Sequence, residues 1–423
     1  MDVTAGEKQD RPRDGGGWSR RGVLSGLLGA PVLLVAACSG SKDVTGRTGA
    51  SGSGGGAPAG SSTPKPSVAK ITVSPADGTT AVPFADPVTV TVQDGTLTSV
   101  TVTDGAGKQI AGQLAADGAS WTSTDRLASG GKYAVAAAAV DKDKRPADAN
   151  AHFSTASPAN TFVGYFTPED GTTVGVGMPV SITFNKPVTD RKAVEQAITV
   201  VADPPVEVVG HWYDATRLDF RPEQYWAKGT KVTLKLRLKD VAGAKGVYGT
   251  QSKDVVFTVG RSQVSVADLR ADTLTVTTDG AVSATYPVIG GAPDHRTWGG
   301  KMVISEQYKE TRMNSATVGL GSEYDIPDVP HAQRLTTSGT FIHGNYWSPA
   351  GQFGSANTSH GCIALQDVQG GGNPGTSAAR FFASSMVGDV VEVVNSGDRT
   401  VNASNGLNGW NLSWADWKAG SAL

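Results

Sequence analysis

The feature that most constrains the fold is an internal duplication in the N-terminal half of the chain. Residues 74–80 read SPADGTT and residues 167–173 read TPEDGTT, so one pattern returns 93 positions later. Each copy is followed by a run in which apolar and polar residues alternate, at 87–92 and at 179–184. Alternation with period two predicts β-strands, and similar segments at a fixed spacing predict a repeated unit. We therefore expect two β-modules of about 90 to 95 residues each.

The strands predicted in both modules are short and are separated by glycine and proline, and neither module has the cysteine pair of antibody domains. This pattern favours two tandem immunoglobulin-like sandwiches, at 68–158 and 159–260. Hairpins then lead to a predicted helix at 377–386 and a last strand at 387–395. We expect a third, β-rich domain at 261–396, and an all-β dominated fold class for the chain.

A tryptophan-rich segment, residues 397–423, follows the third domain. Trp410, Trp414 and Trp417 are spaced like one face of a helix. We expect this face to pack against a neighbouring domain.

Composition excludes some classes of partner and of fold. Lys and Arg total 37 and Asp and Glu 39, so the formal net charge is −2 and no basic field attracts nucleic acid. Two cysteines in very different contexts will not form a disulfide framework. Stability must therefore come from hydrophobic cores. We also expect the protein to be a monomer.

The N-terminus has the pattern of an export signal followed by a linker. Two arginines precede an apolar run at 23–37 that is too short to span a bilayer as a stable helix. The arginine pair resembles a twin-arginine signal, and the run up to Cys38 resembles a bacterial lipobox, in which this sulfur becomes acylated. We expect 1–38 to be a lipoprotein signal peptide and 39–67 a flexible Gly/Ser/Pro linker. The lipidated chain would then be anchored on the outer face of the cytoplasmic membrane, facing the cell wall; a plain secretory signal cleaved near Ala37 is the alternative.

Two histidines and a cysteine near position 350 have the residue types of a nucleophilic site. His343 ends a predicted strand, and Ser359-His360-Gly361-Cys362 follows a loop rich in Gly, Ser and Asn. An imidazole activates a thiol, and a glycine beside the nucleophile lets backbone N–H groups reach a developing oxyanion. A zinc site formed by the two histidines and Cys362 is an alternative, but it lacks a nearby fourth ligand. A buried structural cysteine is another, and it explains neither histidine.

These motifs resemble the signature of the L,D-transpeptidase family. Phe-Ile-His-Gly at 341–344, a loop of small residues and Ser-His-Gly-Cys at 359–362 carry the resemblance, and the domain order is similar to that of multi-domain actinobacterial members. Two positions depart from the family pattern. Ala364 stands where the family usually has Asn or Arg, and 297–300 read TWGG where many members have Thr-Pro before a glycine. We expect these departures to change contacts beside the site and leave the nucleophile intact.

Carried over onto this sequence, the resemblance implies Cys362 as nucleophile and His343 as general base. It implies that a backbone carbonyl near Gly344 fixes His360, which orients the loop, and that backbone N–H groups at Gly361 and Cys362 form the oxyanion hole. The expected substrate contacts are Ser359, Asn357, Gly344, Tyr324, Trp347 and Tyr308.

The resemblance also implies a two-step reaction on peptidoglycan stem peptides. The thiol attacks the third residue of a donor tetrapeptide and releases D-Ala, and the side-chain amine of a second stem's diamino acid resolves the thioester into a 3→3 cross-link. With water as acceptor the chain would be an L,D-carboxypeptidase. Two further alternatives are open. A non-catalytic cell-wall-binding lipoprotein is disfavoured by the intact motif, and a cysteine peptidase is disfavoured because its cysteine usually precedes its histidine in the chain. By the same resemblance we expect carbapenems to acylate Cys362, and we expect no cofactor and no metal.

Overall fold

The computed structural model describes residues 65–319 and 321–423. The signal peptide at 1–38, the lipidation site Cys38 and nearly all of the predicted linker lie outside these described residues. Within them, no helix is long and apolar enough to cross a membrane. The described chain is rich in strands, which confirms the expected fold class.

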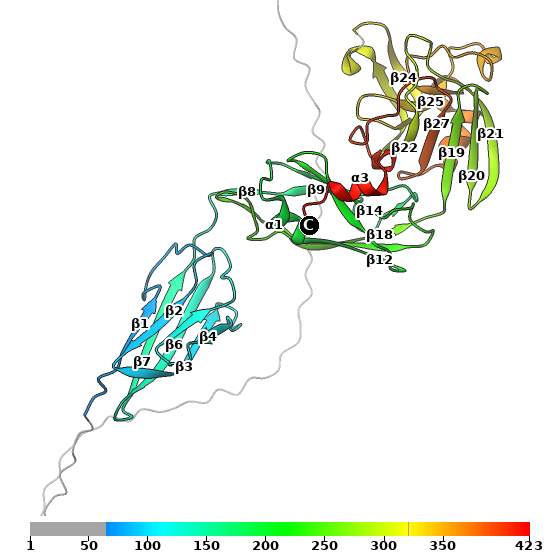
Figure 1. Ribbon diagram of the computed structural model, residues 1–423. Helices are drawn as coiled ribbons and strands as arrows, with labels where there is room; N and C mark the ends of the chain where they lie inside the picture. Colours follow the sequence, from blue (N-terminus) through cyan, green and yellow to red (C-terminus); the bar gives the residue numbers. More distant parts are fainter. Residues whose placement is uncertain (1–64, 320) are drawn as a thin grey trace, which may run out of the picture. The chain divides into compact units, whose positions relative to one another are not determined.

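The first domain is a sandwich of two antiparallel sheets, with strand orders β1-β2-β5-β4 and β3-β6-β7 (Figure 1). Its core follows from alternation, since Tyr133, Val135, Ala137 and Ala139 on one strand all face inward. The strands are β1 (Lys70–Ser74), β2 (Thr89–Gln93), β3 (Gly95–Asp104), β4 (Gly112–Leu114), β5 (Ser120–Ser123), β6 (Lys132–Asp141) and β7 (Pro146–Ser154).

The second domain contains two four-stranded sheets, ordered β10-β18-β15-β12 and β13-β14-β11-β9, and a small sheet β16-β17-β8. Trp212, Trp226 and Phe257 are buried in its core, so both tryptophans contribute to hydrophobic packing. The elements are β8 (Asn160–Phe162), β9 (Gly164–Thr167), β10 (Thr173–Val174), β11 (Val180–Phe184), α1 (Arg191–Gln196), β12 (Ile198–Asp203), β13 (Val209–Trp212), β14 (Arg217–Arg221), β15 (Lys231–Arg237), β16 (Ala242–Ala244), β17 (Val247–Gly249) and β18 (Ser252–Val259).

The duplicated Asp-Gly makes the same turn in both domains. In the first, Asp77 accepts a hydrogen bond from the backbone N–H of a β7 residue at 2.7 Å, and in the second Asp170 accepts one from a β18 residue at 2.8 Å. The glycines that follow, Gly78 and Gly171, have φ of 76° and 74°, a left-handed backbone that side chains disfavour. The sequence repeat is therefore a structural repeat, which ties one turn to the last strand of each sandwich.

The third domain is built on one nine-stranded sheet, ordered β22-β27-β19-β20-β21-β26-β25-β24-β23 (Figure 1). The central strands β25 and β26 are parallel neighbours, and helix α2 packs across them. The elements are β19 (Gln263–Asp268), β20 (Thr273–Thr278), β21 (Ala281–Ile289), β22 (Gly300–Val303), β23 (Glu306–Asn314), η1 (Ser315–Val318), β24 (Asp325–Arg334), β25 (Phe341–Asn345), η2 (Ala350–Gln352), β26 (Ile363–Gln366), η3 (Gln369–Gly371), α2 (Ser377–Ser384) and β27 (Val390–Val394).

Two predicted elements are shorter than expected. The helix ends at Ser384 because Ser385 has extended backbone, with φ −91° and ψ 158°. The last strand begins at Val390 because a turn with Gly388 at φ 95° precedes it. The helix begins where Thr376 accepts a hydrogen bond from Ala379 N–H, as an N-cap does.

The C-terminal segment returns from the third domain to the second and ends with η4 (Gly409–Asn411) and α3 (Trp414–Ala419). Trp410 donates its indole N–H to the Gly177 carbonyl at 2.7 Å, and Trp417 donates to Val209 at 2.9 Å. Packing against a neighbouring domain is thus confirmed, but Trp410 lies outside α3, so the three tryptophans do not share one helix face.

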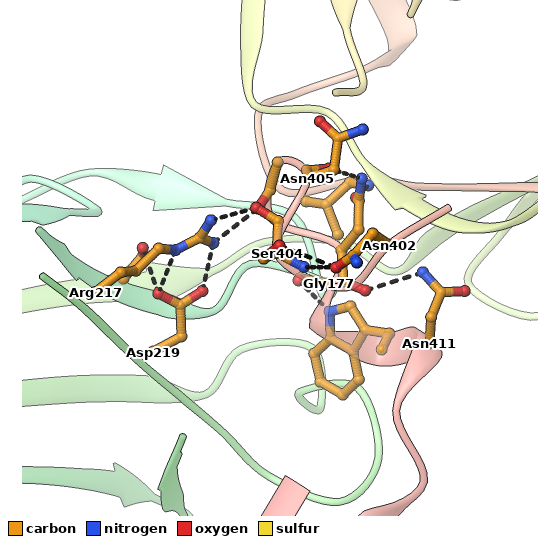
Figure 2. Close-up of polar contacts among 12 residues, drawn as sticks. Gly177, Arg217, Asp219, Asn402, Ser404, Asn405 and Asn411 are labelled. Carbon is orange, nitrogen blue, oxygen red and sulfur yellow. Dashed lines mark hydrogen bonds and ion pairs between the residues drawn. The ribbon is translucent and has the colours of Figure 1, made fainter. Parts of the chain in front are cut away.

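Polar contacts reinforce this joint between the second domain and the C-terminal segment (Figure 2). Arg217 is held by Asp219, with a 2.7 Å contact, and donates to the carbonyl of Ser404 at 2.8 Å. The guanidinium of Arg221 lies 4.3 Å from the Trp417 ring centroid and 4.7 Å from that of Trp410, close enough for cation–π attraction. The chain end is therefore fixed by both charge and aromatic contacts.

Candidate active site

Cys362 immediately precedes β26 and is only 8% exposed. Its sulfur accepts a hydrogen bond from Phe341 N–H at 3.4 Å, and its thiol is directed toward the Gly339 carbonyl, 3.7 Å away. Burial raises the pKa of the thiol to about 11, against the smaller opposite effect of the Phe341 N–H. The cysteine therefore rests as a neutral thiol and needs a base to become a nucleophile.

His343 is positioned by the parallel pairing of β25 with β26. Its register partner is Ala364, and Cys362 lies two residues before that partner, so all three side chains share one face of the sheet. The Nδ1 atom of His343 lies 2.8 Å from the Gly344 carbonyl. A carbonyl only accepts, so Nδ1 carries the hydrogen and Nε2 of the neutral ring has a free lone pair.

Burial also lowers the pKa of His343, which is 5% exposed, and the Gly344 carbonyl opposes this only in part. The ring stacks on Trp347, with centroids 5.8 Å apart. A backbone carbonyl near Gly344 was expected to fix His360, but the Gly344 carbonyl holds His343. The sequence order of the two histidines could not distinguish these partners.

His360 instead lies at the rim of the site, with 39% of its side chain exposed. Its ring centroid is 5.1 Å from that of Tyr324 and 5.0 Å from that of His295. Its Nε2 atom is 3.4 Å from a carboxylate oxygen of Glu323. His295 and Glu323 were not among the residues expected at the site.

Ser359 fixes the loop before Cys362. Its backbone N–H donates to the Gly290 carbonyl at 2.9 Å, and its own carbonyl accepts from Ala292 N–H at 2.8 Å. Its hydroxyl donates to the Cys362 carbonyl at 2.6 Å and accepts from Gly361 N–H at 3.2 Å. Ser359 thus holds the backbone of Cys362, and one of the two N–H groups expected at the oxyanion hole, that of Gly361, is engaged in this state.

Gly361 has φ of 101°, which an L-residue with a side chain rarely adopts. A Cβ atom here would lie 3.6 Å from the nearest heavy atom outside its chain neighbours, the His295 carbonyl oxygen. The requirement for glycine therefore comes from backbone conformation and not from lack of space.

A cleft of about 250 Å³ opens above the thiol and the imidazole. Of the residues expected at the site, it is lined by Cys362, His343, His360, Ser359, Tyr324 and Trp347. Ala364, which was expected to change contacts beside the site, also lines it, as do residues that sequence reasoning did not select, namely Ile289, Met313, Ile326, Asn345, Ser348 and Thr358. Burial raises the pKa of Tyr324 to about 12, with smaller contributions from Cys362 and Glu323.

Asn345 could have been predicted at the site from the sequence, because it is two residues after His343 on the same strand and so faces the same side. Its Oδ1 atom accepts from the backbone N–H groups of Trp347 and Ser348, at 3.1 and 2.9 Å. It therefore holds the turn that places Trp347 over the imidazole.

Three expected substrate contacts lie elsewhere. Gly344 does not line the cleft, and its carbonyl is used by His343; the other two are Asn357 and Tyr308. Asn357 donates to Leu269 and Asp272 and accepts from Gly290 N–H at 2.6 Å, so its amide is used inside the fold. Tyr308 packs against the small cluster that contains Cys362 but does not itself line the cleft, and its hydroxyl bonds the Glu306 carboxylate. The structure thus gives both residues supporting positions.

The donor atoms do not support a zinc site at the nucleophile. Within the described ranges, the only group of three or more metal-ligating side chains with all donor atoms within 4.8 Å comprises His295, Glu323 and His360. Cys362 and His343 are not part of it.

Known protein families match the two parts of the chain separately. Residues 79–242 match the bacterial Ig domain, and residues 262–393 match the L,D-transpeptidase catalytic domain. L,D-transpeptidase 2 of Mycobacterium tuberculosis is 34% identical over 360 residues, which cover 84% of this chain and 85% of the relative. L,D-transpeptidase 5 of the same species is 32% identical over 365 residues, covering 85% and 78%.

Among solved structures, an L,D-transpeptidase in complex with imipenem is 31% identical, with a TM-score of 0.47; the match covers 56% of this chain and all of that one. The identity to L,D-transpeptidase 2 exceeds 30% and extends over most of both chains. The chain therefore belongs to the L,D-transpeptidase family.

Proposed function

We propose that this enzyme forms 3→3 peptidoglycan cross-links through a thioester on Cys362. The sulfur attacks the carbonyl at the L-centre of the third residue of a donor tetrapeptide, and a C–S bond replaces the C–N bond to D-Ala. His343 takes the thiol proton on Nε2 and gives it to the departing amine. The side-chain amine of an acceptor stem then attacks the thioester, forms the new amide and returns the proton to the thiol.

The observation that carries this proposal is the 2.8 Å contact between Nδ1 of His343 and the Gly344 carbonyl. Its Nδ1–H is used by the Gly344 carbonyl, so the free lone pair on Nε2 belongs to the same cleft as Cys362. Within the described part of the chain the thiol makes no hydrogen bond to His343. Its contact with Gly339 is long, at 3.7 Å, so turning the S–H toward His343 costs little.

The oxyanion that forms in each step lies beside the backbone N–H groups of Gly361 and Cys362. The Gly361 N–H donates to Ser359 at 3.2 Å, the long end of the hydrogen-bond range, so a charged oxygen competes well for it. A short 2.6 Å bond from Ser359 to the Cys362 carbonyl keeps the loop in place meanwhile.

The test uses tetrapeptide stems and an amine acceptor, with products identified by mass. The proposal predicts a 3→3 dimer from the parent enzyme and none from Cys362→Ala. It also predicts a carbapenem adduct on the parent that Cys362→Ala lacks. The chain offers a matched control in Cys38→Ala, which should keep both products because the second cysteine lies outside the domain.

Each other outcome assigns a different function. An adduct with only tripeptide product would mean that water is the acceptor, as in an L,D-carboxypeptidase. No adduct on a folded parent would mean a non-catalytic wall-binding protein. An adduct that survives in Cys362→Ala would refute the nucleophile.

We also propose that Cys38 carries a lipid that anchors the enzyme to the outer face of the cytoplasmic membrane. The apolar run at 23–37 that ends at this cysteine supports the proposal. Metabolic labelling with an alkyne fatty acid should mark the parent and not Cys38→Ala. Equal labelling of both would refute the lipidation site.

A further inference from the structure

Three side chains with metal-binding donors meet beside the active site, on three separate loops. His295 lies between β21 and β22, Glu323 lies between η1 and β24, and His360 lies before β26. One donor atom from each lies within 4.8 Å of the other two. Two imidazoles and one carboxylate form a common donor set for a bound transition metal.

The distances fit ligands of one ion better than direct hydrogen bonds. The Glu323 Oε2 atom is 3.5 Å from Nε2 of His295 and 3.4 Å from Nε2 of His360. Good N–H···O bonds span about 2.7–3.2 Å. Ligands about 2.0–2.1 Å from a tetrahedral zinc ion lie about 3.3–3.4 Å from each other, which these two separations nearly match.

The third separation, between the two imidazoles, can adjust. The rings lie with centroids 5.0 Å apart, and 27% of the His295 side chain and 39% of the His360 side chain are exposed. Partly exposed rings on loops can rotate toward a shared ion without disturbing the core. Among the described residues, Glu323 has no Lys or Arg partner, so its charge faces only these two imidazoles.

The surroundings leave room for the fourth ligand. A hollow of about 290 Å³ beside the group is lined by both histidines, and Asp294 also borders it. The Asp294 carboxylate lies 3.9 Å from Nε2 of His295 and is 81% exposed, so it or a water molecule can complete a tetrahedron.

We propose that His295, Glu323 and His360 bind one divalent transition-metal ion, with Zn²⁺ as the ion that the donor set favours. The ion ties the end of the β23–β24 hairpin to the loop that carries the nucleophile. It also fixes His360, whose ring contacts Tyr324 at the wall of the cleft. Neither Cys362 nor His343 ligates the ion, so the site is separate from the proposed chemistry.

The experiment measures Zn²⁺ binding to the full chain after treatment with EDTA and dialysis, by titration calorimetry. The parent is expected to bind one equivalent that Glu323→Gln and His295→Gln bind at least tenfold more weakly. Glu310→Gln, an exposed acidic position on the same hairpin, is the matched control and should bind like the parent. Equal affinity in the parent and both site variants would overturn the proposal.

A second arm excludes coordination by the catalytic thiol. Cys362→Ser should keep the parental affinity, and Co²⁺ in Cys38→Ala, where Cys362 is the remaining cysteine, should give a tetrahedral d–d spectrum without a thiolate charge-transfer band. A thiolate band, or loss of binding in Cys362→Ser, would place the ion on the nucleophile and refute the assignment. The cobalt spectrum needs no site variant, so it decides the question even if Glu323→Gln or His295→Gln fails to fold.

Discussion

Replacing His343 with glutamine should separate base catalysis from the intrinsic reactivity of the buried thiol. A glutamine amide can still donate to the Gly344 carbonyl, but it offers no lone pair basic enough to accept the thiol proton. With a pKa of about 11, only about one Cys362 thiol in 10⁴ is ionised at pH 7. General base catalysis is worth roughly 10²–10⁴-fold, so we expect acylation of the variant to be slower by such a factor at pH 7.

The pH dependence of the two proteins should differ in form. In His343→Gln only the thiolate reacts, so the acylation rate should rise about tenfold per pH unit between pH 7 and 10. In the parent, burial lowers the pKa of His343, and a protonated ring cannot act as a base. The parental rate should therefore fall as the pH falls through a midpoint below the ordinary histidine value of about 6.5, and stay flat above it.

The assay is a time course of carbapenem adduct formation by intact mass, from pH 5 to 10 in buffer with EDTA. His152→Gln, which changes an exposed histidine of the first domain, should keep the parental profile. A variant as fast as the parent at pH 7, or a parental midpoint near 8.5, would refute this reasoning. The latter would mean that the thiolate is already formed before attack.

Three further changes test the fold around the site. Trp417→Ala removes a fully buried indole and its hydrogen bond to the Val209 carbonyl. Denaturant titration should show a free energy of unfolding lower by about 3–5 kcal/mol, and a loss below about 1 kcal/mol would contradict this packing. Asn345→Ala leaves two backbone N–H groups unpaired and should lower the free energy of unfolding by about 1–3 kcal/mol in the same titration. It should also slow acylation because Trp347 is released, and unchanged kinetics would show that this turn does not affect the reaction. Gly361→Ala forces a side chain into a left-handed backbone, so we expect about 1–3 kcal/mol of strain and a lower melting temperature, and an unchanged melting temperature would count against it.

The sequence predicted features that depend on local patterns. The Asp-Gly turns at 77–78 and 170–171 could be recognised because a left-handed turn requires the same residue types wherever it occurs. His343 and Cys362 could be selected because a nucleophile and its base are rare residue types with known chemistry.

Partners that depend on strand order could not be predicted. A backbone carbonyl near Gly344 was expected to fix His360, but His360 lies beside Glu323 and His295, which come from two other loops. Asn357 looked like a loop contact, yet its amide bonds residues almost ninety positions earlier. Ser359 similarly pairs with the strand end at Gly290. Such contacts follow from which strands are neighbours in the nine-stranded sheet, and no short pattern encodes that.

The contacts between the C-terminal segment and the second domain form late, because their two sides are far apart in the sequence. Arg217 and Arg221 leave the ribosome about two hundred residues before the carbonyl at Ser404 and the ring of Trp417 that they contact. Until translation is almost complete, the second sandwich therefore lacks these contacts, and Arg217 has only its local pairing with Asp219. A nascent chain stalled or cut shortly before Trp410 would have the complete loop around Cys362 but would lack the indole bonds to Gly177 and Val209.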